Sequence, residues 1–300
     1  MSLVEKALRK LQDGASRVPA TSAALSPAVE AVVTRETPAR RTLATPEVPR
    51  PDRVISINRP ALQAVGLLPP ESQERALGQQ YRQIKRPLIS GAIGRGASRL
   101  PNGHVILLAS AVPGEGKTFT SINLAFSMSM EKDIHVLLVD ADVAKRHISK
   151  VLSVGDAPGL LDLLRDPSLD VDSVILPTDM PNLSILPAGT ASDQATELLA
   201  SERMEQIVRV IGERDRHRVV LFDSPPVLHT TECHALIQIA GQIVVVVRAG
   251  VTPQQVLLDA LSYLGEHPSV SLILNQSIQS SPEAYYRYGQ SDSLPERPQK

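Results

Sequence analysis

Cysteine, aromatic residues and long apolar runs are all scarce in this sequence. Tryptophan is absent, and the single cysteine, Cys233, excludes an intramolecular disulfide and fits a reducing compartment. The 31 basic residues are matched by 32 acidic ones, so the chain lacks the net positive charge that is typical of proteins that bind nucleic acid. No apolar run approaches the roughly 20 residues that span a bilayer, and the N-terminus lacks the apolar core of a secretory signal. We therefore expect a soluble, cytoplasmic protein that does not bind nucleic acid.

The N-terminal part of the chain has little with which to build a core. Nine of the 24 prolines fall between residues 19 and 70, and no aromatic residue precedes Tyr81. Because no hydrophobic period persists over residues 14–70, we predict a disordered linker there. Ahead of it, residues 1–13 would form a short amphipathic helix with Leu3 on its apolar face. Such a helix either docks on a partner or frays in solution.

From residue 71 onward, helix and strand patterns alternate, and roughly 210 residues are ample for one α/β core. A helix is expected over residues 71–90, ending near Pro87. Strands are then predicted at residues 104–110, 134–139, 183–186, 219–222, 242–247 and 270–274. Helices are predicted at residues 118–130, 160–164, 202–213, 232–239 and 253–264. Continuous Val, Ile and Leu runs indicate strands covered on both faces. The prediction is a mostly parallel, helix-flanked sheet over residues 71–278, followed by a flexible tail at 279–300.

The strongest local signal is the stretch AVPGEGKT at residues 111–118, between a predicted strand and a predicted helix. It follows the phosphate-binding pattern G-x-x-x-x-G-K-[ST], except that Ala111 replaces the first glycine. Lys117 would reach the β- and γ-phosphates, and Thr118 would bind Mg²⁺. A glycine-rich turn with an incidental lysine is the alternative, which the flanking elements disfavour. The residues expected to surround the nucleotide are Pro113, Gly114, Glu115, Gly116, Lys117, Thr118 and Phe119.

Three aspartates follow two further predicted strands. Asp140 and Asp142 end the run LLVDAD, and the period of two points both to one side of an extended chain. Asp223 ends the run VVLFD ahead of two prolines, as a Walker B acid does. At the carboxyl ends of parallel strands, such acids hold Mg²⁺ or accept a hydroxyl proton. Taken alone, an Asp-x-Asp at a strand end is more often a helix cap or a solvated turn, and a lone aspartate after a strand is commonplace. Together the motifs predict nucleotide hydrolysis or phosphoryl transfer.

The C-terminal tail concentrates tyrosine. Tyr285, Tyr286 and Tyr288 are three of only five tyrosines, and they lie among Ser, Gln, Pro and Gly. Aromatic side chains in such a polar tail bury nothing, so they either bind something or are modified, unless the cluster arose by chance. A phosphate on each would add about −1.5 to −2 charges.

These motifs resemble those of the bacterial tyrosine kinases (BY-kinases) of the cytoplasmic CpsD/CapB type, over roughly residues 71 to 290. The Walker A block of the family is similar to residues 110–118, and its Walker A′ block to residues 137–142. Its Walker B ending D-[ST]-P-P matches residues 222–226, and its tyrosine cluster matches the tail tyrosines. Residues 81–87 are most similar to the autokinases that accompany exosortase-linked exopolysaccharide operons.

The resemblance implies a MinD/ParA-like P-loop fold, with ATP and Mg²⁺ as cofactors. Lys117 and Thr118 would bind them, Asp140 and Asp142 would activate the tyrosine hydroxyl and organise the metal, Asp223 would complete the metal site, and Asn275 would contact adenine. It further implies that neighbouring copies in a ring-shaped homo-oligomer phosphorylate one another's tail tyrosines. A transmembrane chain-length-determinant partner would stimulate this at the inner face of the plasma membrane and so regulate polysaccharide export.

Two motifs depart from the family pattern. The family's D-x-D-x-R has arginine where this chain has Ala144, which predicts weaker catalysis. Its oligomerisation motif E-x-x-R-x-x-R aligns with Gln79, Arg82 and Lys85, so that Arg82 and Lys85 would carry a weaker or altered assembly.

Two other functions are compatible with part of the sequence. A MinD/ParA-like positioning ATPase would carry a second P-loop lysine where this chain has Val112, and it offers no reason for the tyrosine tail. A non-catalytic regulator that binds nucleotide would tolerate Ala144 and Gln79.

Overall fold

The computed structural model describes residues 54–94 and 99–277. Its centre is a seven-stranded sheet with the order β3-β4-β2-β5-β1-β6-β7, in which every neighbouring pair is parallel except β3 with β4. The strands are β1 (Val105–Ser110), β2 (His135–Asp140), β3 (Leu176–Pro177), β4 (Leu183–Leu186), β5 (Arg218–Asp223), β6 (Gln242–Arg248) and β7 (Val270–Asn275). This confirms the predicted mostly parallel α/β sheet.

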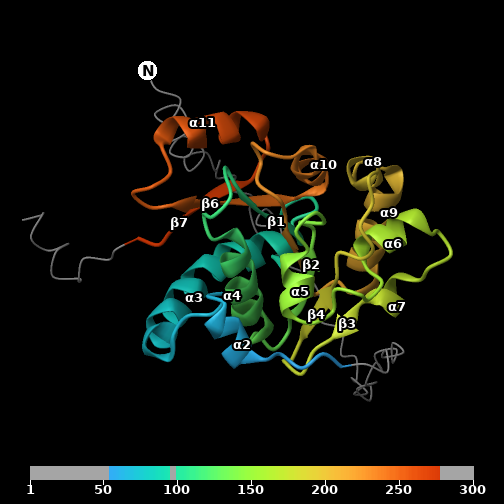
Figure 1. The fold of residues 1–300 in the computed structure, drawn as a ribbon, viewed down its shortest axis with the longest axis horizontal. Coiled ribbons are helices and arrows are strands. Elements are labelled where there is room, and N and C mark those ends of the chain that lie inside the picture. Colours follow the sequence, from blue (N-terminus) through green and yellow to red (C-terminus); the bar gives the residue numbers. More distant parts are fainter. Residues whose placement is uncertain (1–53, 95–98, 278–300) are drawn as a thin grey trace, which may run out of the picture. The chain divides into compact units, whose positions relative to one another are not determined.

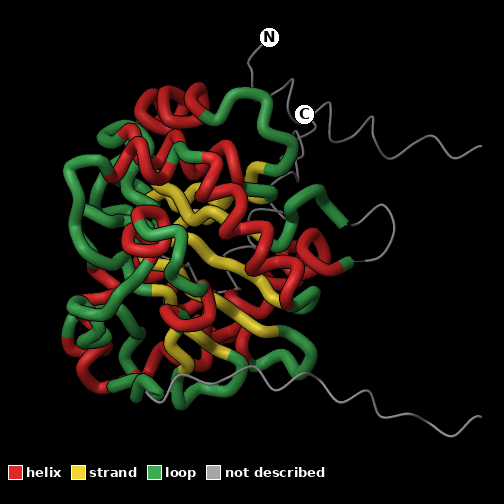
Figure 2. The backbone as a smooth tube through the Cα atoms, turned by 90° about the vertical axis from the view of Figure 1, so that its right-hand side faces the viewer, coloured by secondary structure: helices red, strands yellow, loops and turns green. Residues whose placement is uncertain are grey.

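Helices cover both faces of the sheet, as Figures 1 and 2 show. The first face packs against α2 (Arg59–Ala64), α3 (Glu71–Ile93), α4 (Lys117–Ser129) and α5 (His147–Val151). The second packs against α6 (Leu160–Arg165), α7 (Val171–Val174), α8 (Ala195–Leu199), α9 (Glu202–Arg214), α10 (Thr231–Ile239) and α11 (Gln254–Tyr263). The apolar runs of β1 and β5 are buried along their length because both faces are covered.

Residues 54–70 belong to this fold, so the prediction of a disordered linker is wrong for them. The backbone N–H of Ile55 donates to the Pro177 carbonyl of β3 at 2.8 Å, and Leu62 of α2 is only 1% exposed. Two prolines of this segment mark helix starts instead: Pro60 lies in the first turn of α2, and Pro70 immediately precedes α3. The predicted helix at residues 1–13 and the rest of the predicted linker lie outside the described residues.

Helix α3 continues through Pro87 to Ile93 and so extends beyond its predicted end. Pro87 is exposed, whereas Tyr81, Leu88 and Ala92 are buried on the opposite side. Burial of this face outweighs the cost of Pro87, which is about 3 kcal/mol because the proline removes a helical hydrogen bond and its ring clashes with the preceding turn.

The last strand departs from the expectation of strands covered on both faces. β7 is an edge of the sheet, and Val270, Leu272 and Leu274 are 38%, 55% and 62% exposed. They point to the same face as their β6 neighbours, because parallel neighbours share the pleat. Within the described ranges, no helix has the length and apolarity needed to cross a membrane.

Candidate nucleotide site

The P-loop (residues 111–118) joins β1 to α4 at the carboxyl ends of the parallel strands. Gly114 and Gly116 have φ angles of 86° and 90°, a left-handed conformation that glycine adopts without steric cost. Ala111 is not among the residues with positive φ, so the missing first glycine imposes no strain. The loop amides therefore precede the positive end of α4, as phosphate binding requires.

Asp223 at the end of β5 connects the predicted site residues. Its Oδ1 accepts hydrogen bonds from Lys117 Nζ at 3.0 Å and Ser121 Oγ at 2.9 Å, and its Oδ2 accepts one from Thr118 Oγ1 at 2.8 Å. The Asp223 and Lys117 side chains are both buried. The structure thus brings Lys117, Thr118 and Asp223 together and adds Ser121, which our sequence analysis missed. Its spacing was the available signal, because a residue four positions after Lys117 shares its helix face.

The Walker A′ aspartates occupy different environments. Asp142 lines the cavity at the P-loop, and its Oδ1 accepts a hydrogen bond from Lys145 N at 3.3 Å. Asp140 does not line the cavity. Its Oδ2 accepts hydrogen bonds from Ser149 N at 2.7 Å and Ser149 Oγ at 2.6 Å. The prediction that both carboxylates face the ligand is wrong for Asp140, because the chain leaves the extended conformation after β2 and α5 binds its carboxylate.

Asp140 is fully buried, and in the described part of the chain its Oδ1 has no hydrogen-bond partner. Burial raises the pKa of this carboxyl to about 6, against the lowering effect of the two Ser149 hydrogen bonds. The nearby carboxylates of Asp223 and Asp142 raise it further.

All eight predicted nucleotide-binding residues line one cavity of about 1000 Å³. One wall is polar and consists of the P-loop, Asp142 and Lys145. The opposite wall is formed by residues between Gln63 and Ile84 of α2, α3 and their connection, and it includes Leu67, Leu68 and Tyr81. The segment assigned to a linker therefore forms part of the site. This volume is at the upper end of the range for ligand pockets.

Two predicted contact residues also have structural partners. Asn275 Nδ2 donates to the Glu115 carbonyl at 2.9 Å and lies so close to Gly116 that a Cβ there would be 2.0 Å away. The Glu115 side chain is 2% exposed, and its carboxylate accepts from Val112 N at 2.8 Å and Thr252 Oγ1 at 2.5 Å. The Glu115 carboxylate therefore bonds to groups of the protein and is not free to contact a ligand. Thr252 is a second residue that our sequence analysis missed.

Ala144 leaves the arginine position of the family motif without a cation, and two neighbours lie nearby. Lys145 is exposed and lines the cavity. Arg146 Nη1 instead donates to the Gly189 carbonyl at 2.9 Å. Lys145 is therefore the cation available to a ligand.

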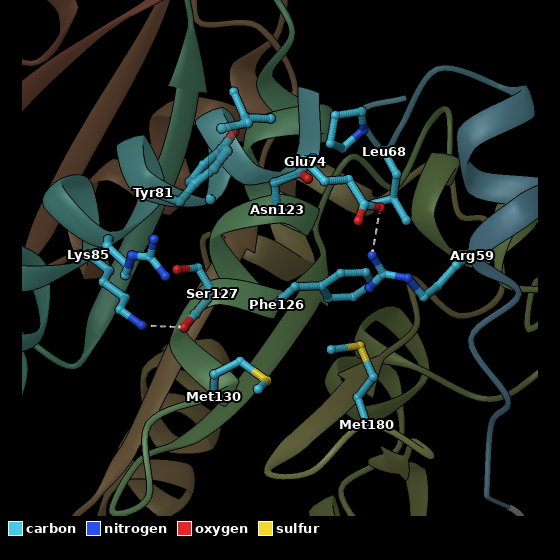
Figure 3. Close-up of a pocket in the computed structure, with 14 residues that line it drawn as sticks. Arg59, Leu68, Glu74, Tyr81, Lys85, Asn123, Phe126, Ser127, Met130 and Met180 are labelled. Atoms are coloured by element: carbon cyan, nitrogen blue, oxygen red, sulfur yellow. Dashed lines mark hydrogen bonds and ion pairs between the residues drawn. The ribbon is translucent and has the colours of Figure 1, made fainter. Parts of the chain in front are cut away.

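The two predicted assembly residues on α3 also have different surroundings, and Figure 3 shows that Lys85 points toward Ser127. Lys85 is buried, and its Nζ donates to the Ser127 carbonyl at 2.6 Å and pairs with Glu131 at 2.7 Å. The prediction that Lys85 contacts another copy is therefore wrong, because its charge is bound within the chain. Arg82 is exposed at the rim of a second cavity of about 360 Å³, and its assembly role stays a prediction.

The residues present fit a magnesium nucleotide. Thr118 and Asp223 supply adjacent oxygen donors, and Asp142 supplies another at the cavity wall. Within residues 54–94 and 99–277, no three His, Cys, Asp or Glu side chains converge as metal ligands. Mg²⁺ suits such a site, because it commonly takes one or two carboxylates and completes its shell with water and substrate phosphate.

The predicted phosphoacceptors Tyr285, Tyr286 and Tyr288 lie outside the described residues. Ser277, the last residue before that part of the chain, lines the nucleotide cavity. The described part of the chain therefore ends beside the site.

Comparisons with known proteins agree with this geometry. A family model described as an AAA domain matches residues 103–265. The tyrosine-protein kinase ptk of Acinetobacter johnsonii is 31% identical over 154 residues, which span 51% of this chain and only 20% of that protein. Tyrosine-protein kinase YwqD of Bacillus subtilis is 27% identical over 72% of this chain and 88% of its own length.

The solved BceF tyrosine kinase domain is 27% identical and superposes with a TM-score of 0.57 over 71% of this chain and 85% of that one. The P-loop, the Walker A′ and B aspartates and these similarities lead to one assignment. The chain belongs to the AAA domain family, and it is similar to bacterial tyrosine kinases.

Proposed function

We propose that this protein is an ATP-dependent tyrosine autokinase that phosphorylates Tyr285, Tyr286 and Tyr288. The observation that carries the proposal is the convergence of Lys117, Thr118 and Asp223 in a cavity that extends to Ser277. Tyr285 follows Ser277 by eight residues, which span at most about 29 Å when fully extended. The relatives named as tyrosine-protein kinases support the same activity.

In this proposal the protein mainly positions groups and balances charge. Lys117 would break its ion pair with Asp223 and bind phosphate instead. The P-loop amides would surround the transferred group. Bound Mg²⁺ would neutralise charge that develops on the phosphates. A tyrosine hydroxyl, with its usual pKa near 10, needs a carboxylate to accept its proton. We assign this task to Asp142, because Asp142 lines the cavity and Asp140 does not.

The proposal includes transfer between copies in a homo-oligomer, stimulated by a transmembrane chain-length-determinant partner at the inner face of the plasma membrane. The output would be control of exopolysaccharide production and export. The family resemblance supports these parts, and so does charge: a phosphorylated tail should be repelled from an acidic, ATP-filled site.

The direct test is to incubate the protein with ATP and Mg²⁺ and to map phosphate by peptide mass spectrometry. Phosphate on the tail tyrosines that is lost in Lys117→Met supports the proposal. Lys150→Met is the matched control, because Lys150 is an exposed lysine of α5 outside the cavity lining. ADP formation with an unmodified tail, in the presence of a candidate activator, would instead indicate a positioning ATPase.

Transfer between copies needs its own experiment. An active copy that lacks the tail is mixed with a Lys117→Met copy that carries it. Labelling of the intact tail is expected, and its absence contradicts transfer in trans.

A further inference from the structure

Glu115 belongs to the P-loop, yet its carboxylate has no role towards a ligand in the proposed reaction. The side chain is buried, and both oxygens are engaged within the protein. Oε2 accepts the backbone N–H of Val112 at 2.8 Å, and Oε1 accepts the hydroxyl of Thr252 at 2.5 Å. Glu115 thus ties the start of the P-loop to a residue 137 positions further along the chain.

The Thr252 hydroxyl is itself held in one orientation. Thr252 ends the turn that follows β6, where its N–H donates to the Arg248 carbonyl at 3.1 Å. The Arg248 N–H donates to Thr252 Oγ1 at 3.3 Å, while this hydroxyl donates its proton to Glu115. A hydroxyl has one proton to donate, so these contacts fix its direction.

We propose that Thr252 is a positioning residue for nucleotide binding, which acts through Glu115 to hold the P-loop in its phosphate-binding conformation. The proposal rests on the proposed function only in that the site binds a nucleotide. The P-loop contains two glycines at positive φ, and glycine has many other conformations available to it. Without the hydroxyl, the buried Glu115 oxygen would lose its partner, and conformations that re-pair this oxygen would compete with the native loop.

A second contact holds the same residue from β7. Asn275 Nδ2 donates to the Glu115 carbonyl and lies against Gly116. The loop is therefore fixed on one side by its own residues and on the other by two side chains, Thr252 and Asn275, that no P-loop motif contains. Binding affinity falls in proportion to the fraction of molecules whose loop is competent.

The experiment measures ADP affinity by calorimetry in three full-length variants. Thr252→Val removes the hydroxyl at nearly constant volume, and a loss of about tenfold in affinity is expected. Thr252→Ser keeps the hydroxyl and should bind within about twofold of the unmodified protein. Thr196→Val is the matched control, because Thr196 is a half-buried threonine of α8 whose hydroxyl contacts Thr231 Oγ1 at 3.1 Å, away from the cavity.

Unchanged affinity in Thr252→Val overturns the proposal, even if the variant unfolds at a lower temperature, because that pattern shows a purely structural role. If Thr252→Val does not fold, Thr252→Ala takes its place under the same criterion. ADP binding is measured without ATP, so the assay requires no tyrosine phosphorylation. A protein that binds ADP but labels no tyrosine would refute the proposed kinase, while the Thr252 variants would still decide this inference.

Discussion

At the scale of single residues, Asp223 engages the two groups that a magnesium nucleotide would need. Lys117 and Thr118, the residues that should receive phosphate and metal, both bond to Asp223. Separating a buried ion pair leaves two desolvated charges, which costs several kcal/mol unless each finds a new partner. Phosphate and Mg²⁺ supply those partners together, so we expect nucleotide affinity to depend strongly on the metal.

Asp223→Asn tests this dependence. Lys117 loses its buried counter-ion, so ADP without Mg²⁺ should bind several-fold more tightly than it binds the unmodified protein. The gain in affinity that Mg²⁺ normally provides should disappear. The measurement is ADP titration in Mg²⁺ and in chelator, with Asp259→Asn on the exposed side of α11 as the control. Metal dependence that survives in Asp223→Asn would show that Asp223 does not hold the metal.

Some of these residues could be predicted and others could not, for a physical reason. The P-loop and Walker B residues are recognisable because their chemistry is set by a few adjacent positions. Ser149 and Thr252 contact Asp140 and Glu115 through the fold, and no local pattern marks them. The predicted orientation of Asp140 was wrong because side chains alternate regularly only within a strand, and β2 ends at Asp140.

At the scale of elements, the segment from residue 54 to 70 is the largest difference from the predicted structure. Proline frequency indicated a linker, but Pro60 and Pro70 mark helix starts. Of the apolar residues between them, Leu62, Leu67 and Leu68 are buried in the core. The regular strands and long helices were predicted well, because their hydrophobic patterns persist over many residues. Short elements such as α5 and β3 have too few residues for a period to appear.

Leu62→Ala tests whether α2 is part of the folded unit. Leu62 is 1% exposed, so its truncation should lower the free energy of unfolding by about 2–5 kcal/mol. Val65, at the end of the same helix, is 58% exposed, and Val65→Ala should change stability by less than about 0.5 kcal/mol. Denaturant titration measures both. Equal stability of the two variants would show that α2 detaches freely.

At the scale of the whole molecule, the proposed assembly and the folding of the chain depend on different residues of α3. Arg82→Ala should reduce self-association, measured by sedimentation velocity, and leave the melting temperature unchanged, because Arg82 is exposed. Lys85→Met should instead destabilise the monomer by about 1–2 kcal/mol, because the Ser127 carbonyl and Glu131 lose their partner. Loss of assembly in Lys85→Met without a change in melting temperature would contradict this division.

The order of the strands has a consequence for how the protein reaches its native state. Leu108 of β1 pairs with Asp223 of β5, and the Lys117–Asp223 contact joins residues 106 positions apart. Contacts between distant residues form slowly, because the intervening chain must first be ordered. A chain that has completed only β1, α4 and β2 would carry the P-loop without its acidic partner. Metal-dependent nucleotide binding would therefore report that folding has reached β5.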